Sequence, residues 1–353
     1  MTKRKIRVGI VFGGRSGEHE VSLMSARSVL DAIDKERYEV VPIGITKAGR
    51  WLPPGRAQRL LTGEAPSEPD NTGTSMVVSS ISETLQAPLD VVFPVLHGPH
   101  GEDGTMQGFL ELANVPYVGA GVLGSALGMD KGKQKEVLRY HGLPVGEWMV
   151  LRRWQWRENR DAALKDASRF GFPCFVKPAN LGSSVGISKA HGPDDLPIAI
   201  EEAFGHDVKI LVEEFVDGRE IEVAVLGNHK PEASIPGEIV PSNEFYDYNA
   251  KYLDGKSEER IPAPLSPELT ERVRAMAVEA FKALECSGMA RVDFFVTRLG
   301  SEVLLNEINT IPGFTPISMY PKLWAATGLP YSKLIDRLIE LAIERWHEKN
   351  QKR

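Results

Sequence analysis

Asp293, Glu307 and Asn309 carry oxygen atoms of the kind that bind a hard divalent cation. They lie in or beside two apolar runs, Val292–Val296 and Val303–Ile308, which are separated by a short turn that contains a glycine. This pattern predicts a β-hairpin. Because strand side chains alternate between two faces, we expect Glu307 and Asn309 on one face, with Asp293 across the hairpin from them.

The folded hairpin sets Asp293 opposite Asn306 or Glu307, depending on the register of its loop. Facing carboxylates repel each other and are costly to bury unless a cation lies between them. Oxygen ligands without a neighbouring histidine or cysteine favour Mg²⁺ or Mn²⁺ over Zn²⁺. The alternative is a hairpin end whose acids are solvated, because charged residues at strand ends usually lie at the surface.

A second group of residues has the chemistry of a phosphate site. Lys177 ends a predicted strand, Cys174–Val176, and a glycine- and serine-rich loop follows it at 182–187. Backbone N–H and hydroxyl groups in such loops bind anionic oxygens. The loop lacks the GxxxxGK[ST] pattern, which excludes a P-loop NTPase, and a hairpin tip is the alternative. Lys131, at the start of a helix predicted to end near Gly142, is expected opposite Lys177.

The N-terminal sequence predicts the start of a βαβ unit. An apolar strand, Ile6–Phe12, is followed by a glycine-rich turn and by a helix with apolar residues at helical spacing,. Glu18 and His19 are expected at the helix entrance, facing the crevice beyond the strand. The glycines do not follow GxGxxG, so the sequence indicates a dinucleotide site only weakly, and a tight turn explains them equally well.

Further apolar strands at Tyr38–Ile45 and Leu89–Leu96 predict a parallel α/β sheet. The stretch Pro53–Pro88 between them is rich in turn-forming residues, and we interpret it as mostly irregular. Val115–Val118 is expected to close this domain, with a hinge at Gly119–Gly121.

His97 and His100 form an HxxH pattern after the third strand. The glycines and the proline around them argue against a helix that would place both imidazoles on one face, so zinc is the weaker interpretation. A loop at the edge of the sheet that contacts a substrate fits better.

Two helices are predicted near the C-terminus. Ser266 and Pro267 give a cap and a first-turn proline to a helix that should end at Gly288. A final helix from Ser332 repeats apolar residues on one face, which indicates packing.

Composition bounds the class of protein. The chain has 353 residues, 42% hydrophobic and 25% charged, which allows two or three soluble domains,. Its net charge of −6 argues against a nucleic-acid partner,. The two cysteines, Cys174 and Cys286, are far apart in apolar surroundings, which is typical of reduced thiols. The sequence shows neither a signal peptide nor a membrane span, so we expect a cytoplasmic location.

Seven motifs, in this order and over nearly the whole chain, resemble the D-alanine–D-alanine ligase family of ATP-grasp enzymes. They are GGRSGEHEVS, LHGPHGEDGTMQG, MDKGKQK, VKPANLGSSVGISK, FYDYNAKY, GMARVDFF and LNEINTIPGFTPISMYP. The resemblance implies an α/β fold, with an N-terminal Rossmann-like domain at 1–120. It also implies two ATP-grasp subdomains, α+β in character, at 121–216 and 217–353.

The resemblance implies a reaction in which ATP phosphorylates the carboxylate of one D-alanine and the amine of a second attacks the acyl phosphate. The dipeptide would serve peptidoglycan synthesis, and a homodimer is expected. Asp293, Glu307 and Asn309 match the ligands of Mg²⁺ or Mn²⁺, with two ions expected. The implied ATP contacts are Lys131, Lys177, Ser183, Ser184, Glu213, Glu214, Phe215, Val216, Glu220, Lys251, Asn306 and Glu307.

The resemblance also implies the catalytic and substrate residues. Glu18 would bind the ammonium group of the first D-alanine beside His97, and Ser318 the carboxylate of the second. Arg291 and the Gly313 amide would stabilise the oxyanion, a role in which preorganised donors are often the largest catalytic contribution. The implied triad over the substrates is Glu18, Ser183 and Tyr252.

Two alternatives stay open. A D-alanine–D-lactate ligase has the same fold, although Tyr252 matches the peptide-forming class. A non-catalytic nucleotide- or NAD-binding protein would use the glycine turn at 13–17, but it leaves the acids at 293–309 and the loop at 182–187 unexplained.

Overall fold

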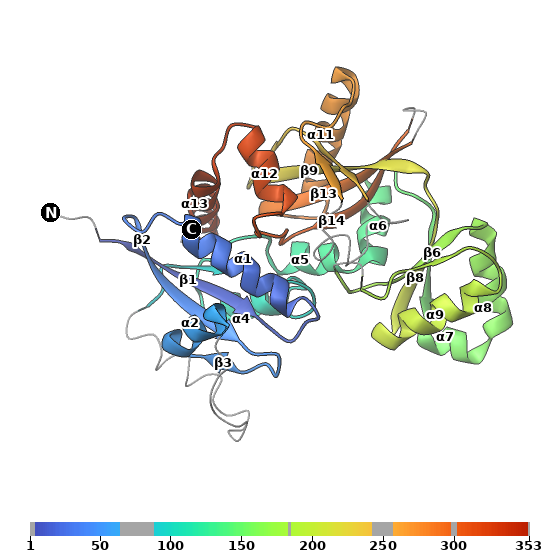
Figure 1. Cartoon of the computed structure of the whole chain (residues 1–353), viewed down its shortest axis with the longest axis horizontal. Helices are drawn as coiled ribbons and strands as arrows, with labels where there is room; N and C mark the ends of the chain where they lie inside the picture. Colours follow the sequence, from blue (N-terminus) through green and yellow to red (C-terminus); the bar gives the residue numbers. More distant parts are fainter. Residues whose placement is uncertain (1–3, 64–87, 183–184, 242–256, 298–301, 352–353) are drawn as a thin grey trace.

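The structure is a computed structural model that describes residues 4–63, 88–182, 185–241, 257–297 and 302–351. Three β-sheets with helices on their faces follow one another along this part of the chain (Figure 1). The mixture confirms the α/β prediction. The predicted domain limits at 120 and 216 stay a prediction.

The N-terminal sheet has the order β3-β2-β1-β4. β1 (Ile6–Gly13) pairs in parallel with β2 (Tyr38–Ile45) and β4 (Val91–Pro94), and β3 (Trp51–Leu52) is antiparallel to β2. The glycine turn after β1 leads into α1 (His19–Ala32), as predicted. Helix α4 (Thr105–Leu112) follows the loop that contains the HxxH pattern.

Two local details differ from the sequence predictions, a helix within Pro53–Pro88 and the end of α11. The first residues of the stretch Pro53–Pro88 form α2 (Pro54–Thr62), because Pro54 suits a first helical turn and two apolar side chains of the helix are buried,. Residues 64–87 lie outside the described residues. Val115–Val118, which was expected to close this domain, lies beside β4, where Tyr117 makes a parallel bridge to Val92. Helix α11 (Pro267–Ala283) ends before Gly288, because Glu285 has a φ of 54°.

The central sheet is antiparallel, in the order β5-β8-β6-β7. Its strands are β5 (Trp148–Arg152), β8 (Lys209–Glu214), β6 (Cys174–Pro178) and β7 (Ser188–Ala190). Helices α7 (Arg153–Glu158), α8 (Arg160–Ala167) and α9 (Asp195–His206) pack with it around a separate apolar core. In Figure 1 this part lies apart from the N-terminal sheet.

The C-terminal sheet has the order β12-β11-β9-β13-β14, with β10 paired to β9. Its strands are β9 (Gly218–Gly227), β10 (Glu232–Ala233), β11 (Gly237–Val240), β12 (Glu258–Arg260), β13 (Gly288–Thr297) and β14 (Val303–Asn309). Helix α11 begins as predicted, with the Ser266 hydroxyl accepting a hydrogen bond from the Leu269 N–H at 3.2 Å. Helix α11 covers one face of the sheet, and α12 (Met319–Ala326) contacts β9.

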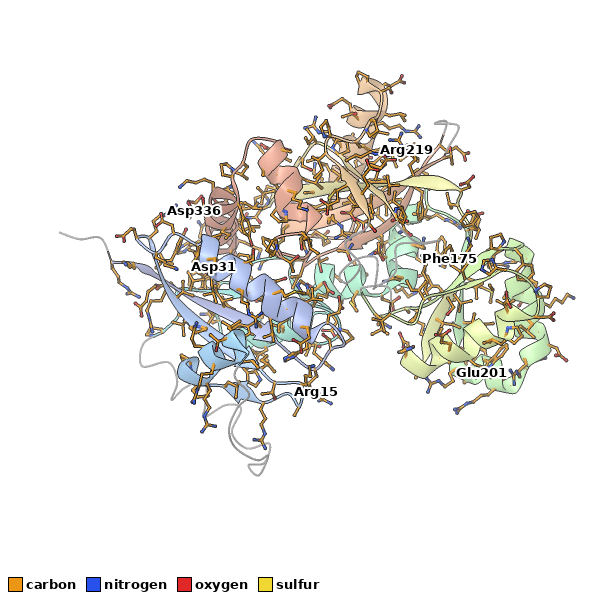
Figure 2. The ribbon with its side chains drawn as sticks, viewed as in Figure 1. Arg15, Asp31, Phe175, Glu201, Arg219 and Asp336 are labelled. Carbon is orange, nitrogen blue, oxygen red and sulfur yellow. The ribbon has the colours of Figure 1, made fainter. Side chains whose placement is uncertain are left out.

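Helices α5 (Val122–Met129) and α6 (Lys131–Tyr140) both contact β14. The sequence predicted a hinge where α5 begins, and it predicted α6 correctly. The final helix, α13 (Tyr331–Asn350), buries Leu334, Leu338 and Leu341, which confirms its predicted packing face. It packs against α1 and β4 of the N-terminal part (Figure 1), and in Figure 2 the labelled Asp31 and Asp336 mark these two neighbouring helices. Among the helices described, none is both long and apolar enough to cross a lipid bilayer.

Candidate functional site

The predicted hairpin is present, and its register is resolved. β13 and β14 are antiparallel, with Asp293 paired to Glu307 and Arg291 paired to Asn309. The register shifts after Asp293, which leaves Asn306 as the additional residue of β14. Of the two registers left open by the sequence, the one that sets Asp293 opposite Glu307 is therefore correct.

Arg291 neutralises Asp293. Its Nε and NH2 atoms donate to the two carboxylate oxygens of Asp293 at 2.7 Å each, and Nε also lies 3.2 Å from Oε2 of Glu222. Burial alone would lower the pKa of Arg291, but Asp293 and Glu222 raise it well above its ordinary value. The guanidinium group is therefore a permanent cation at this face of the sheet.

The predicted metal ligands come together. The Asn309 amide donates to Oδ2 of Asp293 at 3.1 Å, and Glu307 lies across the hairpin from Asp293. Within the described ranges no group of three or more histidine, cysteine, aspartate or glutamate side chains is placed to hold a metal ion. The site offers two carboxylates and one amide, an all-oxygen donor set that suits Mg²⁺ or Mn²⁺. The residues therefore fit the implied metal, and their role as ligands stays a prediction.

A cavity of about 590 Å³ opens between the central and C-terminal sheets. It is large enough for a nucleotide-sized ligand. Phe175 of the central sheet and Arg219 of the C-terminal sheet, labelled in Figure 2, both line it. Among the residues predicted to contact ATP, those that line this cavity are Lys177, Glu213, Glu214, Phe215, Val216, Glu220, Asn306 and Glu307.

A buried ion cluster forms one wall of this cavity. Lys177 Nζ lies 2.7 Å from one carboxylate oxygen of Glu213, and Lys135 Nζ lies 3.4 Å from the other. Burial alone would raise the pKa of Glu213, but the two lysines outweigh it and hold that pKa at about 2. Lys135 was not among the site residues predicted from the sequence. The only signal was its place four residues after Lys131, on the same face of one helix.

Lys131 has different neighbours from those predicted. Its Nζ donates to the Leu181 carbonyl oxygen at 2.8 Å and lies 3.3 Å from Oε2 of Glu307. The lysine that shares a partner with Lys177 is Lys135, because the Lys135 side chain lies one turn further along α6. Lys131 instead connects the segment before the glycine- and serine-rich loop to the predicted metal site.

The segment Glu214–Val216 joins the central sheet to the C-terminal sheet and lines the large cavity. Its Glu214 carboxylate accepts a hydrogen bond from the Glu147 N–H at 2.8 Å, so this side chain orders the connection between the sheets. Phe215 is 38% exposed, and its ring lies 6.3 Å from that of Phe175. An adenine contact for this segment stays a prediction.

A smaller cavity, of about 80 Å³, adjoins the hairpin. The residues predicted to bind and activate the amino acids line it together: Glu18, His97, Arg291, Gly313 and Ser318. These residues come from segments between Glu18 and Ser318, about 300 positions apart in the sequence, and the fold brings them together,. Glu307 and Glu222 line both cavities, so the two spaces meet at the hairpin.

Glu18 and His97 are both buried. The imidazole of His97 lies between the Ser25 hydroxyl, at 3.1 Å from Nε2, and the Ile311 carbonyl oxygen, at 3.2 Å from Nδ1. Burial lowers the pKa of His97, although nearby Glu18 opposes this, and the ring is therefore neutral near pH 7. His100 is exposed, so the two histidines of the HxxH pattern have unrelated surroundings.

Ser318 and Gly313 lie at the far wall of the small cavity. The Ser318 hydroxyl accepts a hydrogen bond from the Thr315 N–H at 3.0 Å and lies 2.8 Å from the Thr315 hydroxyl. A Cβ atom on Gly313 would lie 2.6 Å from the Ser318 hydroxyl oxygen. The tight turn 313–318 therefore holds the serine close to the glycine amide.

Glu102 and Glu222 also line the small cavity, and no pattern in the sequence predicted either of them. Glu102 is buried and accepts a hydrogen bond from the Gly98 N–H at 2.7 Å. Burial raises the pKa of Glu102, and Glu18 adds to the rise. Acids in a glycine-rich loop and in a strand are common, so local pattern gave no sign of either. Ser183, Ser184, Lys251 and Tyr252 lie outside the described residues.

Comparisons with known proteins agree with this arrangement. Residues 7–120 match the family model described as D-ala D-ala ligase N-terminus, and residues 137–340 match D-ala D-ala ligase C-terminus. The chain is 50% identical to the D-alanine–D-alanine ligase of Natranaerobius thermophilus over 99% of this chain and 98% of that one. It is 54% identical to that of Thermoanaerobacter sp. over 99% of both chains.

Two solved structures have the same fold. The D-alanine–D-alanine ligase from Coxiella burnetii has a TM-score of 0.83 at 39% identity and covers 99% of this chain and 97% of its own. The VanG D-Ala:D-Ser ligase from Enterococcus faecalis has a TM-score of 0.82 at 38% identity and covers 96% of this chain and 100% of its own. With its fold, its paired cavities and both family models, the chain belongs to the D-alanine–D-alanine ligase family.

Proposed function

We propose that this chain is an ATP-dependent carboxylate–amine ligase that joins two molecules of D-alanine for peptidoglycan synthesis. One observation carries the proposal: the nucleotide-sized cavity and the small cavity meet at the β13–β14 hairpin, where Glu307 and Glu222 line both. A phosphoryl group can pass between two bound substrates only if their sites adjoin in this way.

The reaction has two balanced steps. A carboxylate oxygen of the first D-alanine attacks the γ-phosphorus of ATP, the bond from that phosphorus to the β–γ bridging oxygen breaks, and ADP leaves. The amine of the second D-alanine then attacks the carbonyl carbon of the D-alanyl phosphate. The carbon–oxygen bond to phosphate breaks, the amine loses a proton, and the products are D-alanyl-D-alanine and inorganic phosphate.

The large cavity supplies positive charge for the nucleotide. Lys177 lines this cavity, and Lys131 lies 3.3 Å from Oε2 of Glu307, which lines both cavities; the two lysines are largely buried. In this proposal Glu214–Val216 would contact the adenine, and Glu220 the ribose. Buried lysines neutralise phosphate charge without reorganisation, which is most of what phosphoryl transfer requires of a protein.

Asp293, Glu307 and Asn309 would hold Mg²⁺ or Mn²⁺, and two ions are expected. A metal ion bound there would neutralise charge on the transferred phosphoryl group. Arg291 lines the small cavity and pairs with Asp293 and Glu222, so its guanidinium group would stabilise the developing oxyanion together with the Gly313 N–H,. The buried Glu18 carboxylate would bind the ammonium group of the first D-alanine, with the neutral His97 next to it.

The test is an assay of purified protein for phosphate release from ATP, combined with chromatography of the products. D-Alanine alone should give phosphate and D-alanyl-D-alanine in equal amounts. D-Lactate and D-serine are then offered as competing second substrates, since a D-Ala:D-Ser ligase has the same fold. Ester or D-alanyl-D-serine as the main product would reassign the acceptor, and ATP binding without turnover would favour a non-catalytic nucleotide-binding protein.

We also propose that the protein is a cytoplasmic homodimer. Size-exclusion chromatography with light scattering would test the dimer.

A further inference from the structure

Gln134 connects the helix that carries two site lysines to the strand that carries two predicted metal ligands. It lies on α6 between Lys131 and Lys135, and its side chain is 1% exposed. Its amide group accepts a hydrogen bond from the Ile308 N–H at 3.0 Å and donates one to the Ile308 carbonyl oxygen at 3.0 Å. It also donates to the Gly128 carbonyl oxygen at 2.7 Å.

Ile308 is the residue between Glu307 and Asn309. It belongs to β14, the outer strand of the C-terminal sheet, which has β13 as its only neighbour in the described order. One side-chain amide therefore pairs with both backbone groups of Ile308, as a neighbouring strand would. Because side chains alternate along a strand, fixing the backbone of Ile308 sets the positions from which Glu307 and Asn309 project toward the site.

The same helix is attached at the opposite side of the site. Asp130, which caps α6 through the Lys133 N–H, pairs with Lys209 of the central sheet, and the Lys131 N–H donates to the Ala179 carbonyl oxygen at 3.0 Å. The contacts of Gln134 thus hold β14 at a fixed distance from α6, and α6 is itself held to the central sheet.

We propose that Gln134 is a positioning residue for phosphoryl transfer, which holds Glu307 and Asn309 in register with Lys131. This inference rests on the proposed function, because it takes Glu307 and Asn309 as the metal ligands. Groups that orient metal ligands without touching the metal typically contribute 10- to 100-fold to metal affinity. The sequence gives no hint of this role, because a glutamine in a helix is ordinarily solvated.

The experiment measures Mn²⁺ binding to the full chain with saturating ADP, from the loss of the electron paramagnetic resonance signal of free Mn²⁺. Gln134→Met keeps the length of the side chain and removes all its hydrogen bonds. We expect the Kd for Mn²⁺ to rise by about tenfold or more. The KM for Mg²⁺ in the ligase assay should rise with it, and high Mg²⁺ should restore part of the kcat.

Asn228→Leu is the matched control. Asn228 also uses one side-chain amide to bridge two backbone groups, accepting from the Gly288 N–H of β13 at 3.2 Å and donating to the Leu341 carbonyl oxygen of α13 at 3.0 Å. It lies outside both cavities, so its loss should lower the melting temperature and leave the Kd for Mn²⁺ unchanged. Gln134→Glu, which keeps the acceptor for the Ile308 N–H, is the second variant if Gln134→Met does not fold, and its Kd should also rise.

An unchanged Kd in the folded Gln134 variants would overturn the inference, and so would an equal rise in Asn228→Leu, which would indicate general destabilisation. These results differ from a failure of the proposed function. In that case the parent protein itself would not bind Mn²⁺ with ADP or release phosphate in the presence of D-alanine.

Discussion

Lys209 Nζ lies 2.5 Å and 2.6 Å from the two carboxylate oxygens of Asp130, a contact that joins β8 of the central sheet to the first turn of α6. The lysine side chain is 7% exposed and that of the aspartate 22%. Asp130 also caps α6 through the Lys133 N–H. This ion pair therefore supports the helix that carries Lys131, Gln134 and Lys135.

Lys209→Met should destabilise the protein by about 2 kcal/mol, because it leaves the carboxylate of Asp130 desolvated without its partner. The double variant with Asp130→Asn should recover part of this loss, since asparagine still caps a helix and carries no charge. Urea unfolding measures both values. Lys133→Met, which breaks an exposed pair with Glu136, should change stability by less than about 0.5 kcal/mol,. An equal loss of unfolding free energy in the single and double variants would show that the Lys209–Asp130 pair does not stabilise the fold.

Gly182 leaves room for the carboxylate of Glu18. A Cβ atom on Gly182 would lie 2.8 Å from Oε2 of Glu18. Gly182→Ala should displace this carboxylate and raise the KM for D-alanine by about tenfold, equivalent to about 1.4 kcal/mol, with a smaller effect on the KM for ATP. Steady-state kinetics with each substrate varied in turn measures the two effects. Gly192→Ala is the control, because nothing lies within 4 Å of its Cβ position.

Glu307→Gln should reduce turnover by about 10²-fold or more without loss of folded structure, because it removes one charged oxygen ligand from the predicted metal site. Circular dichroism checks that the variant is folded, and the dependence of the rate on Mg²⁺ concentration checks the loss of turnover. Glu302→Gln, at an exposed position just before β14, is the control. Near-normal activity of Glu307→Gln at limiting Mg²⁺ would contradict the assignment.

Glu213 should make stability depend on pH in the acid range. Its pKa is held at about 2 by Lys135 and Lys177 against the effect of burial, below the ordinary 4.5. The ionised carboxylate therefore stabilises the fold above about pH 4.5, and this contribution is lost as the pH falls toward 2. The difference corresponds to a contribution on the order of 3 kcal/mol.

Urea unfolding of the parent and of Glu213→Gln between pH 2 and pH 7 tests this dependence. The parent should be the more stable protein near neutral pH, and the gap should narrow as the pH falls below about 4.5. Glu136→Gln, which removes an exposed carboxylate, should instead give a curve nearly parallel to that of the parent. A constant gap between the parent and Glu213→Gln would show that Glu213 does not titrate as argued.

The sequence was informative wherever a local rule decides structure. The β13–β14 hairpin, the start of α11 at Ser266 and the buried face of α13 were all predicted, since alternation, capping and helical periodicity act over a few neighbouring residues. The same rules failed at α2, where turn-forming residues hid a short amphipathic helix.

The site divides in the same way. Motif types and their order indicated Asp293, Glu307, Lys177 and Glu18 as residues with chemistry, because each stands beside a recognisable strand, turn or helix entrance. Only the tertiary structure decided that Asp293 pairs with Glu307, that Lys135 shares Glu213 with Lys177, and that Gln134 holds Ile308. These contacts join residues distant in sequence, and their geometry depends on how the sheets and helices pack, which no local pattern encodes.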